Sequence, residues 1–125
     1  MVVVDSCGWL QYIKGGALAD SFTEAVRSAD QVIPAIVVFE VFRVLRREAA
    51  NALADELVDH MLTLTVAPLD RELAIEAVGV SAESGLATAD AIIYATALAH
   101  GATLVTCDKH FAGLPGVEYF PASPE

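Results

Sequence analysis

Residues 86–111 read LATADAIIYATALAHGATLVTCDKHF, and the fold class follows from this stretch. Its first half is strongly apolar, with Asp90 as its only charged residue, and indicates a buried helix, which we expect Thr88 to cap and Gly101 to end. The run TLVT at residues 103–106 follows at once and is typical of a short buried strand. A buried helix that leads directly into a buried strand is the unit from which parallel α/β folds are built.

The same alternation extends over the rest of the chain. Short apolar runs predict further strands at residues 2–4, 31–33, 64–66 and 117–120. Segments of helical composition lie between them, at residues 17–29, 34–49, 51–62 and from residue 70 onward. With right-handed crossovers, this order predicts an α/β fold: a three-layer sandwich in which helices flank a short parallel central sheet of about five strands.

Length and composition narrow the class of protein. The 125 residues are expected to form a single domain, 1–125, with residues 121–125 as a loose tail. The hydrophobic content of 55% and the mean hydropathy of +0.53 predict a tightly buried core and a homodimer interface. No apolar run approaches the roughly 18–20 residues of a membrane span, and no cationic segment precedes the first apolar run, so we expect a cytoplasmic protein without membrane contact.

The formal net charge of −10 argues against a surface that binds nucleic acid unspecifically. It does not exclude a nuclease, because carboxylates that bind a divalent cation contribute to this total and are neutralised locally by the ion.

Four acids, Asp5, Glu40, Asp90 and Asp108, are far apart in the sequence but are predicted to converge. Asp5 ends the first strand and Asp108 follows the fourth, and ligands of open α/β sheets bind at the carboxyl ends of the strands. Helices that return the chain begin at this same edge. Asp90 therefore lies there too, and Glu40 lies about a turn and a half into its helix.

Each acid also has a purely structural explanation. Asp5 and Asp108 can cap the helices that follow them, and Asp90 can complement a helix dipole. Glu40 can pair with Arg43, three residues further along the same helix. Two isolated acids within apolar helices and two at strand ends on one edge are harder to explain together than singly, which favours a shared site.

The segments VVVDSCGWL, PAIVVFEVFRVL, LATADAIIYATALAHGATLVTCDKHF and VEYF resemble, in this order, the signatures of the PIN-domain ribonucleases. More narrowly, they are similar to the VapC toxins of VapBC toxin–antitoxin pairs, and the resemblance covers essentially the whole chain. Its most specific part is A-D-A-x-I-x-A-x-A leading to T-x-D-x-x-F, whereas V-D-S is weak alone. By position, the four acids match the family's acidic quartet, and the polar residues that support it match Ser6 and Thr106.

The resemblance implies a metal-dependent endoribonuclease that hydrolyses RNA phosphodiester bonds as the toxin of a type II toxin–antitoxin system. Because the quartet offers carboxylates and no histidine or cysteine ligands, Mg²⁺ or Mn²⁺ is expected rather than zinc. Asp5, Asp90 and Asp108 would be metal ligands, and Glu40 would be either a ligand or the group that orients the attacking water. The resemblance leaves open whether one metal ion or two take part in the reaction. RNA as substrate and a VapB-like antitoxin as partner follow from the same resemblance.

Other interpretations remain open at this level. A PIN-type nuclease of RNA processing, outside toxin–antitoxin systems, and a catalytically inactive protein-binding module both fit the fold. A phosphoacceptor receiver domain is disfavoured, because Ser6 follows Asp5 where an acidic pair would be needed and Asp70 opens a helix.

Three further features have alternative interpretations. The arginines 43, 46 and 47 form either a patch that guides RNA phosphates or a solvated helix face. His110 is expected to be an incidental surface residue. Cys7 and Cys107 are expected to be free thiols. In the family's sheet order the first and fourth strands are neighbours, which would bring these cysteines to one rim, and a redox-linked bridge there depends on suitable geometry.

Overall fold

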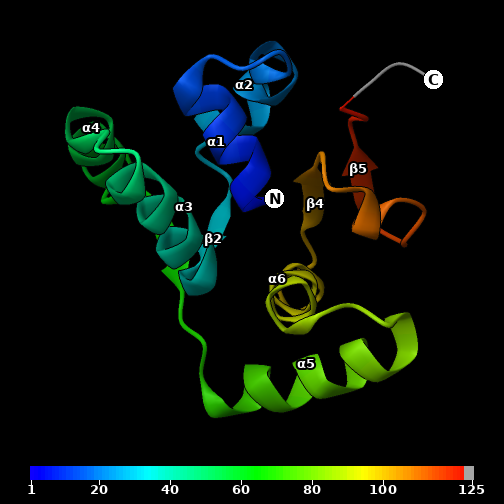
Figure 1. Ribbon diagram of the computed structural model, residues 1–125. Coiled ribbons are helices and arrows are strands. Elements are labelled where there is room, and N and C mark those ends of the chain that lie inside the picture. Colours follow the sequence, from blue (N-terminus) through cyan, green and yellow to red (C-terminus); the bar gives the residue numbers. More distant parts are fainter. Residues whose placement is uncertain (123–125) are drawn as a thin grey trace.

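The computed structural model describes residues 1–122, in which short strands and α-helices alternate (Figure 1). The strands are β1 (Val2–Val4), β2 (Val32–Pro34), β3 (Thr65–Ala67), β4 (Thr103–Thr106) and β5 (Val117–Tyr119). The α-helices are α1 (Ser6–Lys14), α2 (Ala19–Arg27), α3 (Ala35–Arg47), α4 (Asn51–Met61), α5 (Arg71–Ser84) and α6 (Thr88–Ala99), and a 3₁₀ turn, η1 (Lys109–Phe111), follows β4. Of the expected tail, residues 121 and 122 are exposed and belong to no helix or strand, and residues 123–125 lie outside the described residues.

The strands that pair are parallel to one another. β1, β4 and β5 form one ladder in that order, and β2 pairs with β3 in a second. A bridge between Val2 and Gln31 joins the two ladders, so that the strands follow the order β3-β2-β1-β4-β5. The predicted α/β fold with a short parallel sheet is therefore confirmed. The junction of β1 with β2 is a single bridge because strands of three or four residues offer little length for pairing in a twisted sheet.

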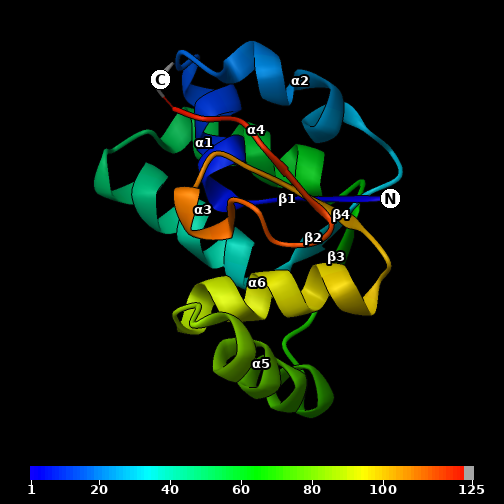
Figure 2. The ribbon, with the colours of Figure 1, turned by 90° about the vertical axis from the view of Figure 1, so that its right-hand side faces the viewer.

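Helices cover both faces of the sheet, which confirms the three-layer arrangement (Figures 1 and 2). On one side α6 packs against the sheet and α5 lies outside it, while α1, α2 and α4 lie on the other side. α3 begins where β2 ends and packs on α1, α4 and α6. The starts of α1, α3 and α6 are thereby brought to the edge at which the strands end.

The core consists of large apolar side chains from the sheet and from both helical layers, among them Trp9, Phe22, Ile33, Leu45, Ile93, Leu104 and Phe111. α1 can approach α2 because Gly8 has no side chain. A Cβ atom at Gly8 would lie 2.6 Å from the ring of Phe22 and 2.8 Å from Cγ1 of Val4. This close packing fixes the first turn of α1, which adjoins Asp5. Within the described residues, no helix combines the length and apolar character needed to cross a membrane.

The expected cap of α6 is wrong by one residue. Ala87 occupies the N-cap position in an extended conformation, and its side chain makes no capping hydrogen bond. Thr88 is already the first helical residue. The other end is as expected: the helix ends at Ala99, and Gly101 follows with φ 62°, a left-handed conformation that glycine adopts without strain.

Candidate active site

Asp5 lies where β1 ends and α1 begins, and it is buried, with 3% of its surface exposed. Its Oδ1 accepts a hydrogen bond from the backbone N of Ser6 (2.8 Å), and its Oδ2 accepts one from Oγ1 of Thr106 (2.8 Å). The first bond caps α1, so the capping interpretation is correct, but the second ties the carboxylate to a neighbouring strand. Burial raises the pKa of Asp5 above its ordinary value, and the hydrogen bonds from Thr106 and Ser6 oppose this only partly.

Thr106 ends β4 and is fully buried. Its Oγ1 donates to Asp5 and accepts a hydrogen bond from the backbone N of Asp108 (2.9 Å). One hydroxyl thus links the acid that follows β1 to the backbone of the acid that follows β4. Ser6, the other predicted supporting residue, faces the same place: its Oγ lies 3.5 Å from Oδ1 of Asp5, and its side chain lowers the pKa of Glu40.

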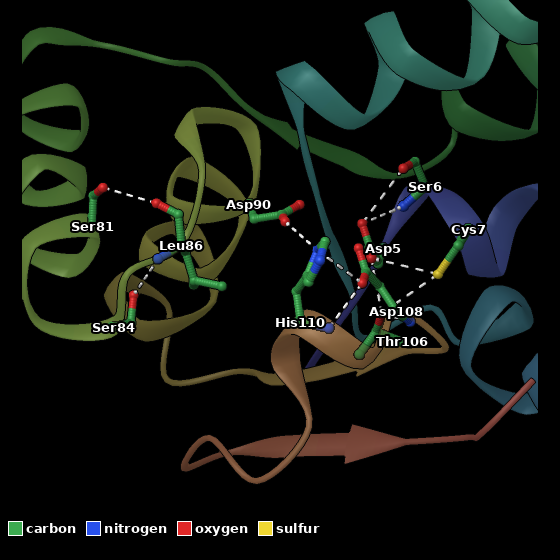
Figure 3. A network of polar contacts seen from close by, with 10 residues as sticks. All are labelled: Asp5, Ser6, Cys7, Ser81, Ser84, Leu86, Asp90, Thr106, Asp108 and His110. Atoms are coloured by element: carbon green, nitrogen blue, oxygen red, sulfur yellow. Dashed lines mark hydrogen bonds and ion pairs between the residues drawn. The ribbon is translucent and has the colours of Figure 1, made fainter.

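Asp90 and Asp108 approach each other across the site, with His110 between them (Figure 3). Asp90 lies in the first turn of α6, and Asp108 caps η1 by accepting a hydrogen bond from the backbone N of His110 (2.9 Å). Nδ1 of His110 lies 3.5 Å from Oδ2 of Asp90 and 3.2 Å from Oδ1 of Asp108. Burial raises the pKa of Asp90, repulsion from Asp108 raises it further, and His110 lowers it.

Glu40, on α3, is close enough to Asp5 and Asp90 for their charges to raise its pKa. Its Oε1 is buried and has no hydrogen-bond partner. The pKa of Glu40 is raised chiefly by burial and further by repulsion from Asp5 and Asp90, while Arg43 opposes the shift only weakly. The guanidinium of Arg43 lies over the ring of Phe39, 5.3 Å from its centre, and among residues 1–122 Arg43 forms no ion pair with Glu40. The proposed Glu40–Arg43 pair is therefore wrong, because the arginine stacks on its own helix instead.

The four acids act on one another electrostatically, and among the described residues the ligand atoms that lie within 4.8 Å of one another come from Asp90, Asp108 and His110. Repulsion from Asp90 raises the pKa of Asp5 and of Glu40, and repulsion from Asp108 raises the pKa of Asp90. Within the described part of the chain, no lysine or arginine forms an ion pair with any of them. A cluster of partly buried, mutually repelling carboxylates is stabilised by a divalent cation, for which carboxylate oxygens are the preferred ligands.

The two cysteines lie at the rim of this cluster. β1 and β4 are neighbours, as expected, and Sγ of Cys7 accepts a hydrogen bond from the backbone N of Cys107 (3.2 Å). Both are free thiols, which confirms that expectation. The Cys107 side chain and burial raise the pKa of Cys7, while the Cys7 side chain lowers the pKa of Cys107.

The arginines at positions 43, 46 and 47 are exposed along α3. Nη1 of Arg46 donates to Oδ1 of Asn51 (3.3 Å), and Glu48, the acid that follows these arginines, pairs with Lys14 at 2.7 Å. The positive charge beyond Glu40 is therefore not paired with Glu48.

His110 is the residue of this site that the sequence interpretation set aside. It lies two residues after a capping aspartate in a one-turn helix, a spacing that brings its ring back over that aspartate. The sequence signal that indicates this position of His110 is the D-x-H spacing directly after a strand.

Taken together, these features define an α/β protein with an acidic site at the carboxyl edge of a short parallel sheet. The family model of the PIN domain matches residues 2–117, so the chain belongs to the PIN domain family, a family of nucleases.

Several solved structures share this fold. A toxin–antitoxin complex from Klebsiella pneumoniae contains a chain that is 24% identical, with a TM-score of 0.84 over 97% of this chain and 99% of that one. VapBC2 from Rickettsia felis, bound to a promoter DNA fragment, is 17% identical, with a TM-score of 0.74 over 96% and 99%. VapC20 from Mycobacterium tuberculosis, a toxin that cleaves the sarcin–ricin loop, is 16% identical, with a TM-score of 0.70 over 98% and 91%. No curated protein matches the chain.

Proposed function

We propose that the protein is a metal-dependent endoribonuclease whose four acids bind Mg²⁺ or Mn²⁺. The observation that carries this proposal is the buried Oε1 of Glu40, which has no hydrogen-bond partner and faces other acids whose pKa values are raised. Such an oxygen costs free energy unless a cation or a water satisfies it. The donor set fits a hard divalent cation, because Mg²⁺ and Mn²⁺ prefer carboxylate oxygens.

The exposure of each side chain indicates its role in the proposed site. Asp90 and Asp108 are partly exposed and would hold the cation on the side that a substrate reaches, and buried Asp5 would hold it from within. Thr106 keeps the Asp5 carboxylate in one orientation through its hydrogen bond to Oδ2. Oε1 of Glu40 is available either to bind the cation or to accept a hydrogen bond from the attacking water. When bound, the cation would stabilise the charge that develops on the phosphate and favour deprotonation of water.

The proposed biological role is that of a toxin in a type II toxin–antitoxin system, with RNA as substrate and a VapB-like antitoxin as partner. Two chains that share the fold over nearly their whole length support this role: one is part of a toxin–antitoxin complex, and the other is a toxin that cleaves the sarcin–ricin loop. The chain has a net charge of −10, but the exposed arginines of α3 supply positive charge near Glu40. This positive charge would attract the phosphates of RNA.

The endonuclease proposal is tested with a covalently closed circular RNA. We expect the purified protein with Mg²⁺ or Mn²⁺ to convert the circle to linear RNA, because only internal cleavage can open it. Gel electrophoresis measures the conversion. Asp90→Asn, purified in the same way, controls for contaminating nucleases and should leave the circle closed. Degradation of linear RNA from its ends with the circle intact would contradict the proposal.

We also propose that the protein is a homodimer. Ile75 and Val78 lie three residues apart on α5 and are 66% and 69% exposed, beside a hollow of about 470 Å³ between α5 and α6. Association would remove this apolar surface from water.

Light scattering at micromolar concentration should give twice the chain mass of 13.2 kDa. Val78→Glu should shift the mass toward the monomer, and Glu76→Gln, an exposed position on the same helix, should not. A wild-type monomer contradicts the proposal.

A further inference from the structure

The ring of His110 occupies the open side of the acidic site. It belongs to η1, its side chain is 64% exposed, and its Nδ1 lies between the carboxylates of Asp90 and Asp108 (Figure 3). Ligand atoms of these three residues lie within 4.8 Å of one another. In a site composed only of oxygen donors, this nitrogen would serve only as an ion-pair partner of the two acids.

The distances suit a shared cation as well as a direct ion pair. A charge-assisted hydrogen bond from an imidazolium to a carboxylate spans about 2.7–2.9 Å, and a single Nδ1–H cannot point along two such bonds. The observed separations of 3.2 Å and 3.5 Å are longer. Two donors that bind one cation at about 2.1 Å and at right angles lie about 3 Å apart, close to the observed values. The arrangement therefore has the spacing of three ligands of a common ion, and the same three groups form ion pairs where no metal is bound.

We propose that His110 is a nitrogen ligand of the metal site and gives it a preference for Mn²⁺ over Mg²⁺. This inference rests on the proposed metal-dependent function. Imidazole nitrogen suits first-row transition metals, whereas Mg²⁺ binds oxygen and keeps much of its water. With His110 present, the site combines one imidazole with several carboxylates. The same side chain thus adds little to Mg²⁺ binding and much to Mn²⁺ binding.

The first test is spectroscopic and needs no substrate. Electron spin-echo envelope modulation of the Mn²⁺-loaded full-length protein is expected to show coupling to an imidazole ¹⁴N nucleus. His110→Ala should abolish that coupling. His100→Ala is the matched control: it follows the far end of α6, roughly 15 Å along the helix axis from Asp90, and should leave the coupling unchanged. Calorimetric titration of the same proteins gives the affinities.

We expect His110→Ala to weaken Mn²⁺ binding at least about tenfold and Mg²⁺ binding less than about twofold. An increase in cation affinity would instead support the competing explanation: if His110 is only an internal counter-ion, its removal strengthens the binding of both cations. That result overturns the inference, as does ¹⁴N coupling that is absent from the wild type or persists in His110→Ala. In those cases Mn²⁺ still binds, so the proposed metal-dependent function stands. Failure of the wild type to bind Mn²⁺ or Mg²⁺ overturns both.

Discussion

Asp5→Asn is expected to reduce RNA cleavage at least about a hundredfold while the protein remains folded. The carboxylate of Asp5 would hold the cation from inside the site, and an amide supplies no negative charge to do so. The variant removes charge without changing the size or shape of the side chain, so a loss of activity is attributable to the lost ligand. Cleavage of a circular RNA and thermal melting, measured on the same preparation, separate activity from folding.

Stability should change little because asparagine keeps the local contacts of Asp5. Its Oδ1 can still accept the hydrogen bond from the backbone of Ser6, and asparagine caps helices about as well as aspartate, within roughly 0.5 kcal/mol. The amide nitrogen replaces Oδ2, and the hydroxyl of Thr106 has lone pairs to accept from it. Without metal the variant is expected to melt at or above the wild-type temperature, since burial raises the pKa of Asp5 and so disfavours its charged form.

Asp70→Asn provides the matched control. Asp70 caps α5 through a hydrogen bond from the backbone N of Leu73 (2.9 Å), and it belongs to none of the acid contacts of the site. The same substitution there changes a capping carboxylate and should preserve cleavage. If Asp5→Asn cleaves RNA at the wild-type rate, Asp5 only caps α1 and the four-acid site is wrong.

The fold was predictable because its signals are local. The apolar run of α6, the glycine that follows it and the strand at 103–106 specify a helix–strand unit without knowledge of any contact. The convergence of the four acids then required only the rule that parallel strands end at one edge. Asp5 could not be assigned to capping or to a site from sequence, because it caps α1 with one oxygen and bonds Thr106 with the other.

The remaining features depend on side-chain directions that the sequence does not fix. Arg43 is three residues from Glu40 and could reach it, but the ring of Phe39 offers an alternative contact on the same helix. His110 turns toward the acids only because η1 is a single tight turn capped by Asp108.

Removal of divalent cations with EDTA is expected to abolish RNA cleavage and to lower the melting temperature at neutral pH. Cleavage is lost because the cation that would activate water and stabilise the phosphate charge is gone, and stability falls because the repulsion among the carboxylates is no longer relieved. At a free Mg²⁺ concentration of 100 times its dissociation constant, binding to the folded state adds about 2.7 kcal/mol to the free energy of unfolding. The stabilisation should be much smaller near pH 4–5, where protons compete with the cation for the carboxylates.

The metal-free protein should show the opposite dependence on pH at these groups. Burial raises the pKa values of Asp5, Glu40 and Asp90 in the folded state. An acid with a raised folded-state pKa favours folding below its unfolded pKa of about 4, and this contribution is lost as pH rises through the folded value. Metal-free protein is therefore expected to lose stability from these groups as pH rises from about 4 through their raised folded-state pKa values, and Mg²⁺ should restore it above that range.

Thermal melts with Mg²⁺ and with EDTA, at about pH 5 and pH 7.5, measure both effects. Glu40→Gln removes one acid with a raised pKa, so its metal-free form should melt above the wild type at the higher pH and gain less from Mg²⁺. Glu76→Gln changes the charge equally at an exposed position of α5 and should behave as the wild type. A melting temperature at pH 7.5 that is the same in Mg²⁺ and in EDTA, together with undiminished cleavage in EDTA, would mean that the acids bind no cation. The repulsion that raises the pKa of Asp90 would then have to be balanced within the protein, and His110 is the group placed to balance it.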